Sequence, residues 1–268
     1  MPDVSFCVLA SGSSGNAALF STGQTRILLD AGLSMKELGR RLAIIGESID
    51  AIDAILITHE HSDHVSGLPI LARAQKPGRD GKPKVRATIY MTRLTAPAID
   101  WGEFSPRLET FQAGACFRIG DVEVTSFSIP HDAIDPVAFC VEAGGIRVGV
   151  VTDLGYIPVS VKFHLRRTDL LLLESNHDLD MLKVGPYPWS IKQRVMSRVG
   201  HLSNLGMSEY LLQDLDASTA RLVLGHLSEQ NNHPEIVRMV AQQSLDERGL
   251  RTELSIASQN APSELFRF

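Results

Sequence analysis

The segment at residues 58–64, Thr-His-Glu-His-Ser-Asp-His, constrains this chain more than any other feature. It follows the apolar residues 54–57, so its histidines stand at the end of an expected strand. Imidazole and carboxylate groups are ligands that suit zinc or manganese. Side chains alternate along an extended segment, which puts His59 and His61 on one side, whereas Asp63 and His64 fall at a turn and could face a second ion. The pattern predicts a metal site rather than a polar loop with incidental histidines.

Composition places the chain among globular proteins with a full hydrophobic core. Its 268 residues suit one large or two small domains, and 44% of them are apolar. The formal charge of −5 argues against a general nucleic-acid coat but is compatible with a local basic patch. No apolar run approaches the ~20 residues of a membrane span, and the N-terminal residues lack the basic region of a signal peptide. We therefore expect no membrane association.

The cysteines favour a reducing compartment. Cys7, Cys116 and Cys140 all lie in apolar, strand-like stretches. Their odd number and unpaired spacing predict buried thiols rather than disulfides. We expect a cytoplasmic protein.

Hydrophobic periodicity divides the chain into short strands and helices, with no repeat or linker between them. Strands are expected over 4–10, 17–22, 25–31, 51–58, 88–92, 116–118, 121–129, 137–142, 146–152, 169–174, 221–225 and 252–256. Helices are expected over 34–45, 66–74, 159–167, 190–199, 208–215 and 234–248, with a further helix and an irregular piece between 93 and 112. The pattern by itself gives only mixed α and β structure.

A basic loop at 76–84, Lys-Pro-Gly-Arg-Asp-Gly-Lys-Pro-Lys, interrupts the first half of the chain. One interpretation is a solvated surface excursion. The other is a basic finger that touches phosphates, since contacts to a nucleic-acid backbone come largely from Lys and Arg.

Three more candidate ligands follow apolar runs: His131, Asp153 and His226. Strand ends that converge on one edge of a fold bring distant residues together. The tetrapeptide Gly-His-Leu-Ser occurs at 200–203 and 225–228, and we assign His226 to the metal because it ends a strand. His201 lies between two expected helices. It is placed to meet a phosphate or to donate a proton, or else makes a structural hydrogen bond.

The motif Thr58-His59-x-His61-x-Asp63-His64 resembles the signature of the metallo-β-lactamase fold superfamily. The resemblance implies an α+β fold, a four-layer α/β/β/α sandwich, over residues 1–268 as a single domain. It also implies two divalent metal ions, zinc or manganese. The ligands implied for the first ion are His59, His61 and His131; those for the second are Asp63, His64 and His226, with Asp153 bridging.

Five stretches narrow the resemblance further: 9–16, 173–178, 187–192, 200–204 and 226–232. Together they resemble the YycJ (WalJ) group, DNA exonucleases that act 5′ to 3′ and are related to ribonucleases Z and J. The chain has no room for the large inserted domain of the ribonuclease J type, and its 76–84 loop is longer than the group leads us to expect.

This resemblance implies a metal-dependent phosphodiesterase with nucleic acid, DNA, as its partner. The ions would activate a water that Asp63 or Asp153 holds in line. A glutamate near the position of Glu174 orients a histidine corresponding to His201 in the related nucleases, a pair suited to protonating a leaving oxygen.

Several residues are candidates for substrate binding. Ser13, Ser14 and Asn16 belong to a Gly/Ser loop that could offer N–H groups and hydroxyls to a terminal phosphate, although such loops commonly just make turns. His177 either serves nearby or lies on the surface. Trp189, with Tyr187, either stacks a base or packs in the core. Basic residues of the second half could extend a backbone track: Arg166, Arg167, Lys192, Arg194 and Arg198.

Two rival functions remain open at this stage. A thioester or lactone hydrolase would use the same two metals, and a closed apolar pocket would favour it over a basic groove. A nucleic-acid-binding scaffold without turnover would show a missing ligand, and every expected ligand is present. The sequence does not choose between zinc and manganese, DNA and RNA, or the two polarities, and gives no oligomeric state.

Overall fold

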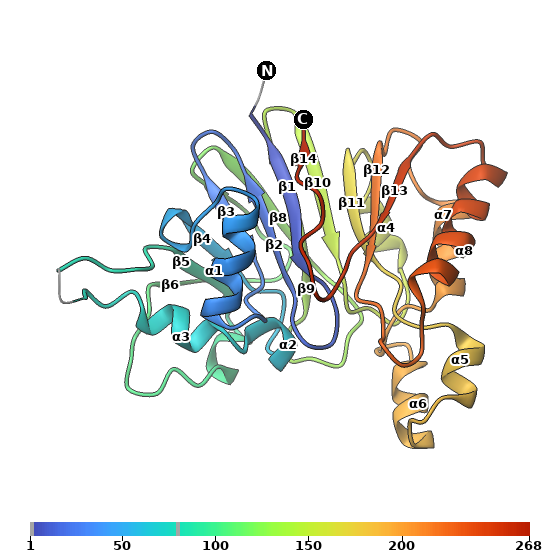
Figure 1. Cartoon of the computed structure of the whole chain (residues 1–268), viewed down its shortest axis with the longest axis horizontal. Coiled ribbons are helices and arrows are strands. Elements are labelled where there is room, and N and C mark those ends of the chain that lie inside the picture. Colours follow the sequence, from blue (N-terminus) through green and yellow to red (C-terminus); the bar gives the residue numbers. More distant parts are fainter. Residues whose placement is uncertain (1–2, 79–80) are drawn as a thin grey trace.

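The computed structural model describes residues 3–78 and 81–268. Two sheets pack against each other, and helices cover the outer face of each sheet (Figure 1). The four-layer α/β/β/α architecture expected from the resemblance is confirmed. The first and last strands, β1 and β14, lie side by side, and the loop that carries α2 lies at the lower edge in Figure 1.

The first sheet has seven strands in the order β14-β1-β2-β3-β4-β5-β6. Neighbours from β14 to β3 are antiparallel, and those from β3 to β6 are parallel. Its strands are β1 (Ser5–Ala10), β2 (Ala17–Ser21), β3 (Arg26–Leu29), β4 (Ala54–Leu56), β5 (Thr88–Thr92), β6 (Leu108–Phe111) and β14 (Phe266–Arg267).

The second sheet repeats this plan in the order β13-β12-β11-β10-β9-β8-β7. Its neighbours from β7 to β10 are antiparallel, and those from β10 to β13 are parallel. Its strands are β7 (Cys116–Ile119), β8 (Val122–Ser128), β9 (Val137–Ala143), β10 (Ile146–Val151), β11 (Leu170–Glu174), β12 (Arg221–Gly225) and β13 (Glu253–Ile256).

The helices begin where local caps are available. Ser34 accepts a hydrogen bond from the Glu37 N–H at the start of α1, and Asp178 and Ser203 cap α5 and α7 in the same way. The helical segments are α1 (Met35–Ile44), η1 (Ile49–Ala51), α2 (Ser62–Val65), α3 (Leu68–Arg73), η2 (Ala96–Ala98), α4 (Val159–His164), α5 (Leu179–Val184), α6 (Trp189–Val195), α7 (Asn204–Gln213) and α8 (Pro234–Glu247).

Alternation along the strands builds the layers. On β1, Phe6 and Val8 belong to the cluster between the two sheets, whereas Cys7 and Leu9 belong to the cluster under α1 and α3. A third cluster joins the outer face of the second sheet to α4, α7 and α8. Each sheet is thus apolar on both faces, so the polar residues at its strand ends stand out.

Some expected elements differ from the structure. Asp63 and His64 lie in the short helix α2 rather than in a turn, and the strand before the motif is only Ala54–Leu56. The region 93–112 forms only the short η2, where Pro97 lies, followed by the edge strand β6, whose exposed residues hide its pattern. Cys116 is exposed because β7 is an edge strand, so the expectation that all three thiols are buried was wrong for this one. Arg79 and Asp80 of the basic loop lie outside the described residues.

Candidate metal centre

The site forms where strands of both sheets end at the same edge. Segment 58–64 follows β4, and Asp30 follows β3. From the second sheet, His131 follows β8, Asp153 follows β10 and His226 follows β12. The predicted convergence of these strand ends is what the structure shows.

The first cluster consists of His59, His61 and His131, whose ring nitrogens lie within 4.8 Å of one another. Nε2 of His131 is 3.2 Å from Nδ1 of His61. Nε2 of His59 is buried and has no hydrogen-bond partner among the described residues. Burial holds the pKa of His59 well below its ordinary value, so the ring is neutral and keeps a free lone pair. Three imidazoles whose ligand nitrogens lie this close together are a ligand set for a divalent transition metal.

The second cluster consists of Asp63, His64, Asp153 and His226. Nε2 of His226 lies 3.3 Å from both Oδ2 of Asp63 and Oδ1 of Asp153, and Nε2 of His64 lies 3.2 Å from Oδ2 of Asp153. Burial would lower the pKa of His226, but Asp153 and the other carboxylates raise it to about 10. The carboxylates therefore make this cluster a strong attractor of cations.

Asp30 supports the clusters from behind. Its Oδ1 accepts from the Thr58 N–H, both its oxygens lie 3.0 Å from the Thr58 hydroxyl, and its Oδ2 lies 2.8 Å from Nδ1 of His64. A carboxylate at Nδ1 fixes the ring so that Nε2 faces the ligand site. We did not predict Asp30 from the sequence, although it ends an apolar run as Asp153 does.

Glu174 ties His201 to the second cluster. Its Oε1 lies 2.8 Å from Nδ1 of His201 and 2.9 Å from Nδ1 of His226, and its Oε2 accepts from the backbone N–H groups of Leu154 and Leu202. Burial would raise the pKa of Glu174, but His201 and His226 lower it to about 2. In return, Glu174 raises the pKa of His201 against the effect of burial. The predicted pair thus lies in contact, with the His201 side chain 24% exposed.

The four residues Asp153, Glu174, His201 and His226 also lie close enough to hold an ion. Two of them are shared with the second cluster, so the two sets compete for His226. His226 is 2% exposed and faces Asp63, whereas His201 reaches the opening. This geometry favours His226 as the ligand, in line with the assignment made from the sequence.

Strained backbone positions several of these side chains. In the described ranges, four non-glycine residues have positive φ: Asp30, Asp153, Arg167 and His226. Such residues are uncommon, and a concentration of them at one site is typical of functional centres. The left-handed turn at the strand end directs each of the three site residues back across the edge of its sheet.

The candidate substrate-binding residues differ in accessibility. Ser13 and Ser14 are exposed at the edge. Asn16 is buried, and its amide nitrogen lies 3.2 Å from Oδ2 of Asp63, so it faces the ligands. His177 is 1% exposed, both its ring nitrogens lack a partner in the described part of the chain, and burial lowers its pKa to about 4. The alternative that His177 lies on the surface is therefore wrong.

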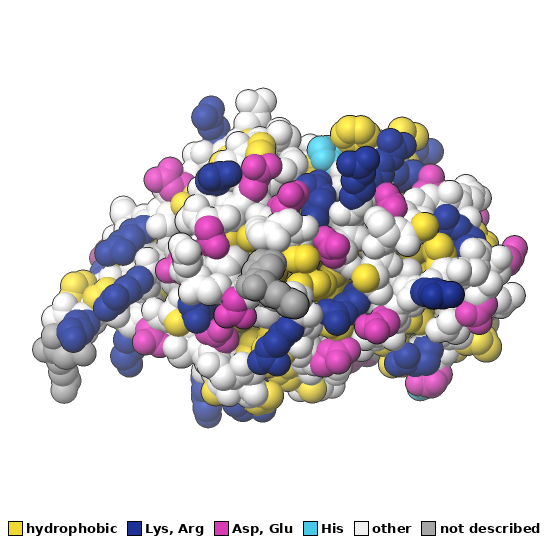
Figure 2. Space-filling model, turned by 90° about the horizontal axis from the view of Figure 1, so that it is seen from above, with side chains coloured by type: hydrophobic (Ala, Val, Ile, Leu, Met, Phe, Trp, Pro, Cys, Tyr) yellow, Lys and Arg dark blue, Asp and Glu magenta, His cyan; other side chains and the backbone are white. Residues whose placement is uncertain are grey.

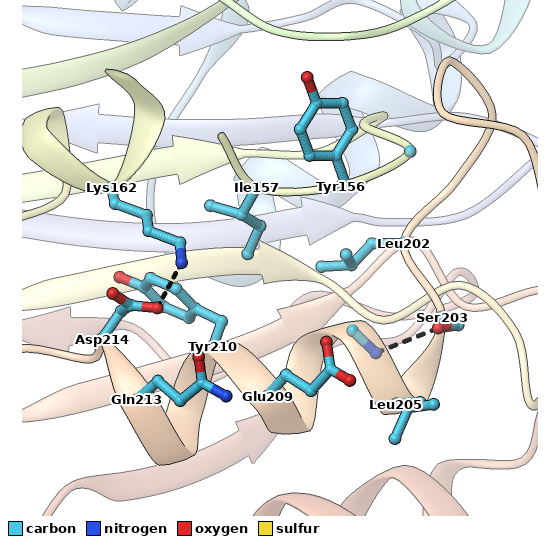
Figure 3. A pocket seen from close by; sticks show the side chains of 12 residues that line it. Tyr156, Ile157, Lys162, Leu202, Ser203, Leu205, Glu209, Tyr210, Gln213 and Asp214 are labelled. Atoms are coloured by element: carbon cyan, nitrogen blue, oxygen red, sulfur yellow. Dashed lines mark hydrogen bonds and ion pairs between the residues drawn. The ribbon is translucent and has the colours of Figure 1, made fainter. Parts of the chain in front are cut away.

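A cavity of about 330 Å³ adjoins the site between the loop after β10 and helix α7 (Figure 3). Its walls combine apolar side chains such as Ile157 and Leu205 with Glu209 and the Lys162–Asp214 ion pair. No member of the clusters described above lines it. It is not a closed apolar pocket leading to the metal ligands.

The fold, together with the His and Asp clusters at one edge of the two sheets, indicates the protein superfamily. A profile of the Beta-lactamase superfamily domain matches residues 25–227, so the chain belongs to that superfamily. The His and Asp clusters fit the divalent metal ions that the fold implies.

Two curated relatives narrow the class. The chain is similar to "Exodeoxyribonuclease WalJ" of Streptococcus pneumoniae, at 36% identity covering 87% of this chain and 85% of the relative. It is equally similar to "Exodeoxyribonuclease YycJ" of Bacillus anthracis, at 36% identity over 91% and 90% of the two chains. The chain therefore belongs to the WalJ/YycJ family.

A solved structure supports the fold alone. The metallo-β-lactamase fold protein YhfI from Bacillus subtilis superposes with a TM-score of 0.73 at 18% identity, covering 98% of this chain and 100% of that one. None of the helices formed by the described residues combines the length and apolarity that crossing a bilayer requires.

Proposed function

We propose that the protein is a dinuclear metal-dependent phosphodiesterase that degrades DNA from the 5′ end. The observation that carries this proposal is the adjacency of the two ligand clusters and the Glu174–His201 pair at one edge. Two neighbouring ions suit phosphodiester hydrolysis, and a buried carboxylate behind a partly exposed histidine suits proton transfer to the leaving oxygen. The exodeoxyribonuclease names of the relatives support DNA as the substrate.

His59, His61 and His131 would hold one ion, and Asp63, His64 and His226 the other, with Asp153 between them. Bound zinc or manganese would lower the pKa of a water and neutralise charge on the phosphate. The neutral state of His59 and its free Nε2 fit this assignment. Asp30 and Asn16 would keep His64 and Asp63 in position through the contacts described above.

The chain supplies orientation and a proton. Asp63 or Asp153 accepts a hydrogen bond from the attacking water and holds it in line with the scissile bond. Glu174 occupies Nδ1 of His201, which leaves Nε2 to protonate the leaving oxygen. The oxygen of water joins phosphorus and releases one proton to solvent, the bond from phosphorus to O3′ of the terminal nucleotide breaks, and O3′ receives the proton of His201, which regains one from solvent. The shortened strand then carries a new 5′-phosphate and is again a substrate.

The terminal phosphate would meet the loop 11–16. Ser13 and Ser14 are exposed there, and their hydroxyls are available to an anion. The Ser14 N–H is engaged by Oε1 of Gln259, so it is the hydroxyls that we assign to the phosphate. Because the cavity of Figure 3 contains no cluster residue, the structure gives less support to a thioester or lactone hydrolase. Free thiols at Cys7, Cys116 and Cys140 support action in the cytoplasm.

The test is a time course on 5′-phosphorylated duplex DNA labelled at either end, with manganese or zinc. We expect mononucleotides to be released first from the 5′ end, and chelator to stop the reaction. A matching RNA and an unphosphorylated duplex serve as controls for substrate class and for the Ser13–Ser14 loop. Turnover of a thioester or lactone with no cleavage of DNA would contradict the proposal.

A further inference from the structure

Residues 179–199, here called the arm, form an excursion between β11 and α7. The arm contains α5 and α6 and projects below the second sheet in Figure 1, on the side of the molecule where α2 lies. Lys192 is buried and donates from Nζ to the carbonyl oxygen of Lys183 at 2.7 Å. This bond ties α6 to α5, so the arm has a defined shape.

The arm is fastened beside the first cluster. Nδ1 of His131 lies 3.1 Å from the carbonyl oxygen of Gly200, which directly follows the arm. The N–H of Asp132 donates to the carbonyl oxygen of Val199 at 2.9 Å, and the Asp132 carboxylate pairs with Arg194. A ligand lying along the arm therefore passes next to the candidate metal ligands.

The surface of the arm is apolar and aromatic. Val184 is 86% exposed, Trp189 62% and Val199 45%. The alternative that Trp189 packs in the core is therefore wrong. Large apolar side chains gathered on one exposed element mark an interaction surface.

The arm is also basic in an acidic chain. It contains Lys183, Lys192, Arg194 and Arg198 but only one carboxylate, Asp180, so its formal charge is +3. The rest of the chain then carries −8, because the total is −5. On the face shown in Figure 2, by contrast, acidic and basic side chains are interspersed. A local positive charge next to an exposed aromatic ring is the combination that binds single-stranded nucleic acid.

We propose that the arm is a platform for the DNA strand, on which Trp189 stacks a base outside the scissile nucleotide while Arg198 faces its phosphates. Arg198 lies 4.2 Å over the ring of Tyr156, which positions the guanidinium and leaves its N–H groups for a phosphate. Lys192 takes no part, since its ammonium group is buried against Lys183. This inference rests on the proposed function and adds which surface holds the substrate beyond the reacting bond.

The first experiment measures binding without turnover. The chain has two tryptophans, so Trp101→Phe leaves Trp189 as the only indole fluorophore. We expect a 5′-phosphorylated 12-mer of deoxythymidine, added with chelator present, to quench this fluorescence. In an anisotropy assay with the same oligonucleotide, Trp189→Ala should weaken binding by about 5-fold to 100-fold. Met239→Ala, which removes a side chain 63% exposed on α8, should change affinity less than about 2-fold.

Charge reversal tests the electrostatic part. Arg198→Glu on the arm and Lys36→Glu on α1 change the net charge equally at exposed positions. We expect the arm variant to reduce the slope of log affinity against log salt by about 1, and the α1 variant to leave it unchanged. Equal effects of the two reversals would overturn the proposal, as would the absence of quenching.

Hydrolysis of bis(p-nitrophenyl) phosphate separates this inference from the proposed function. The small diester does not reach the arm, so Trp189→Ala should leave its turnover unchanged while raising KM for the 12-mer. Normal cleavage of the 12-mer by this variant would contradict the proposed role of the arm but would not affect the proposed nuclease function. If the unmutated protein hydrolysed neither substrate, the proposed nuclease function itself would be contradicted. Self-association that Trp189→Ala abolishes would assign the surface to a second copy and overturn the platform.

Discussion

Asp30 and Asp153 occupy corresponding places in the two sheets, but their carboxylates have different hydrogen-bond partners. Each follows the strand at which its sheet changes from antiparallel to parallel, β3 in one and β10 in the other. Both are almost fully buried, both have φ near 60°, and both are followed two residues later by a glycine that has no room for a Cβ. The same backbone conformation, an aspartate with positive φ followed two residues later by a tightly packed glycine, therefore ends the strand in both sheets.

Their surroundings differ. Both oxygens of Asp30 are satisfied by Thr58 and His64, so this carboxylate fixes the orientation of the His64 ring. Oδ2 of Asp153 has no hydrogen-bond partner among the described residues and faces Nε2 of His64 instead. A strained strand end therefore delivers a buried carboxylate, and we propose that the donors around it decide whether it positions a neighbouring histidine or is left to bind an ion.

The largest loss of activity is expected from a substitution of Asp153. Asp153→Asn keeps the shape of the side chain but removes a negative charge from the second cluster, so we expect DNA cleavage to fall below detection. Circular dichroism of the chelated variant should match that of the unmutated protein. Activity within about 10-fold of normal would show that Asp153 is no more than a support like Asp30.

His201 tests whether the second sheet also supplies the proton. His201→Ala should lower kcat by about 10²-fold to 10⁴-fold, the usual range for a general acid. Metal content, measured by plasma mass spectrometry, should remain unchanged. If this variant lost one of the two ions, His201 would be a metal ligand and not the proton donor.

Asp30 is expected to matter less than Asp153. Asp30→Asn leaves the cluster residues in place but weakens the hold on Nδ1 of His64, so metal affinity should fall by about 10-fold to 100-fold. Competition with a fluorescent chelator measures the change. Asp121→Asn, at a carboxylate bound by the hydroxyls of Thr22 and Thr25, is the matched control and should not alter affinity. An unchanged metal affinity in Asp30→Asn would show that Asp30 matters no more for metal binding than the control residue Asp121.

The smallest effect on activity is expected at His177, which belongs to none of the ligand clusters. Burial lowers its pKa to about 4, so the unfolded chain binds the proton more tightly. Stability should therefore rise as pH increases from about 4 to 6.5, by up to about 3 kcal/mol for this group. Urea unfolding of His177→Phe across that window should show a shallower pH dependence than the unmutated chain. An identical dependence would mean that another group is responsible.

That these His and Asp side chains lie close together could be predicted because they follow apolar strands. His59, His131, Asp153 and His226 each follow a run whose strand character is clear from β-branched and aliphatic residues. Asp30 has the same signal but stands alone, without a neighbouring histidine in the sequence, so its contact with His64 is visible only after β3 and β4 pair.

Other features depend on tertiary context. The edge strand β6 and the two-residue β14 have too little buried pattern to distinguish them from loops. The position of His177 could not be read from Glu174-Ser-Asn-His177, because which side of the segment is covered depends on Ser203, whose backbone pairs with it. The arm was expected only as one helix over 190–199, and α5 was missed because it spans just six residues.

The most direct test of the metal centre is anomalous diffraction from crystals grown with manganese or zinc. We expect two peaks per chain, one among His59, His61 and His131 and the other among Asp63, His64 and His226, with Asp153 in contact with both. A single peak, or a peak held by Glu174 and His201 in place of the second, would contradict this expectation.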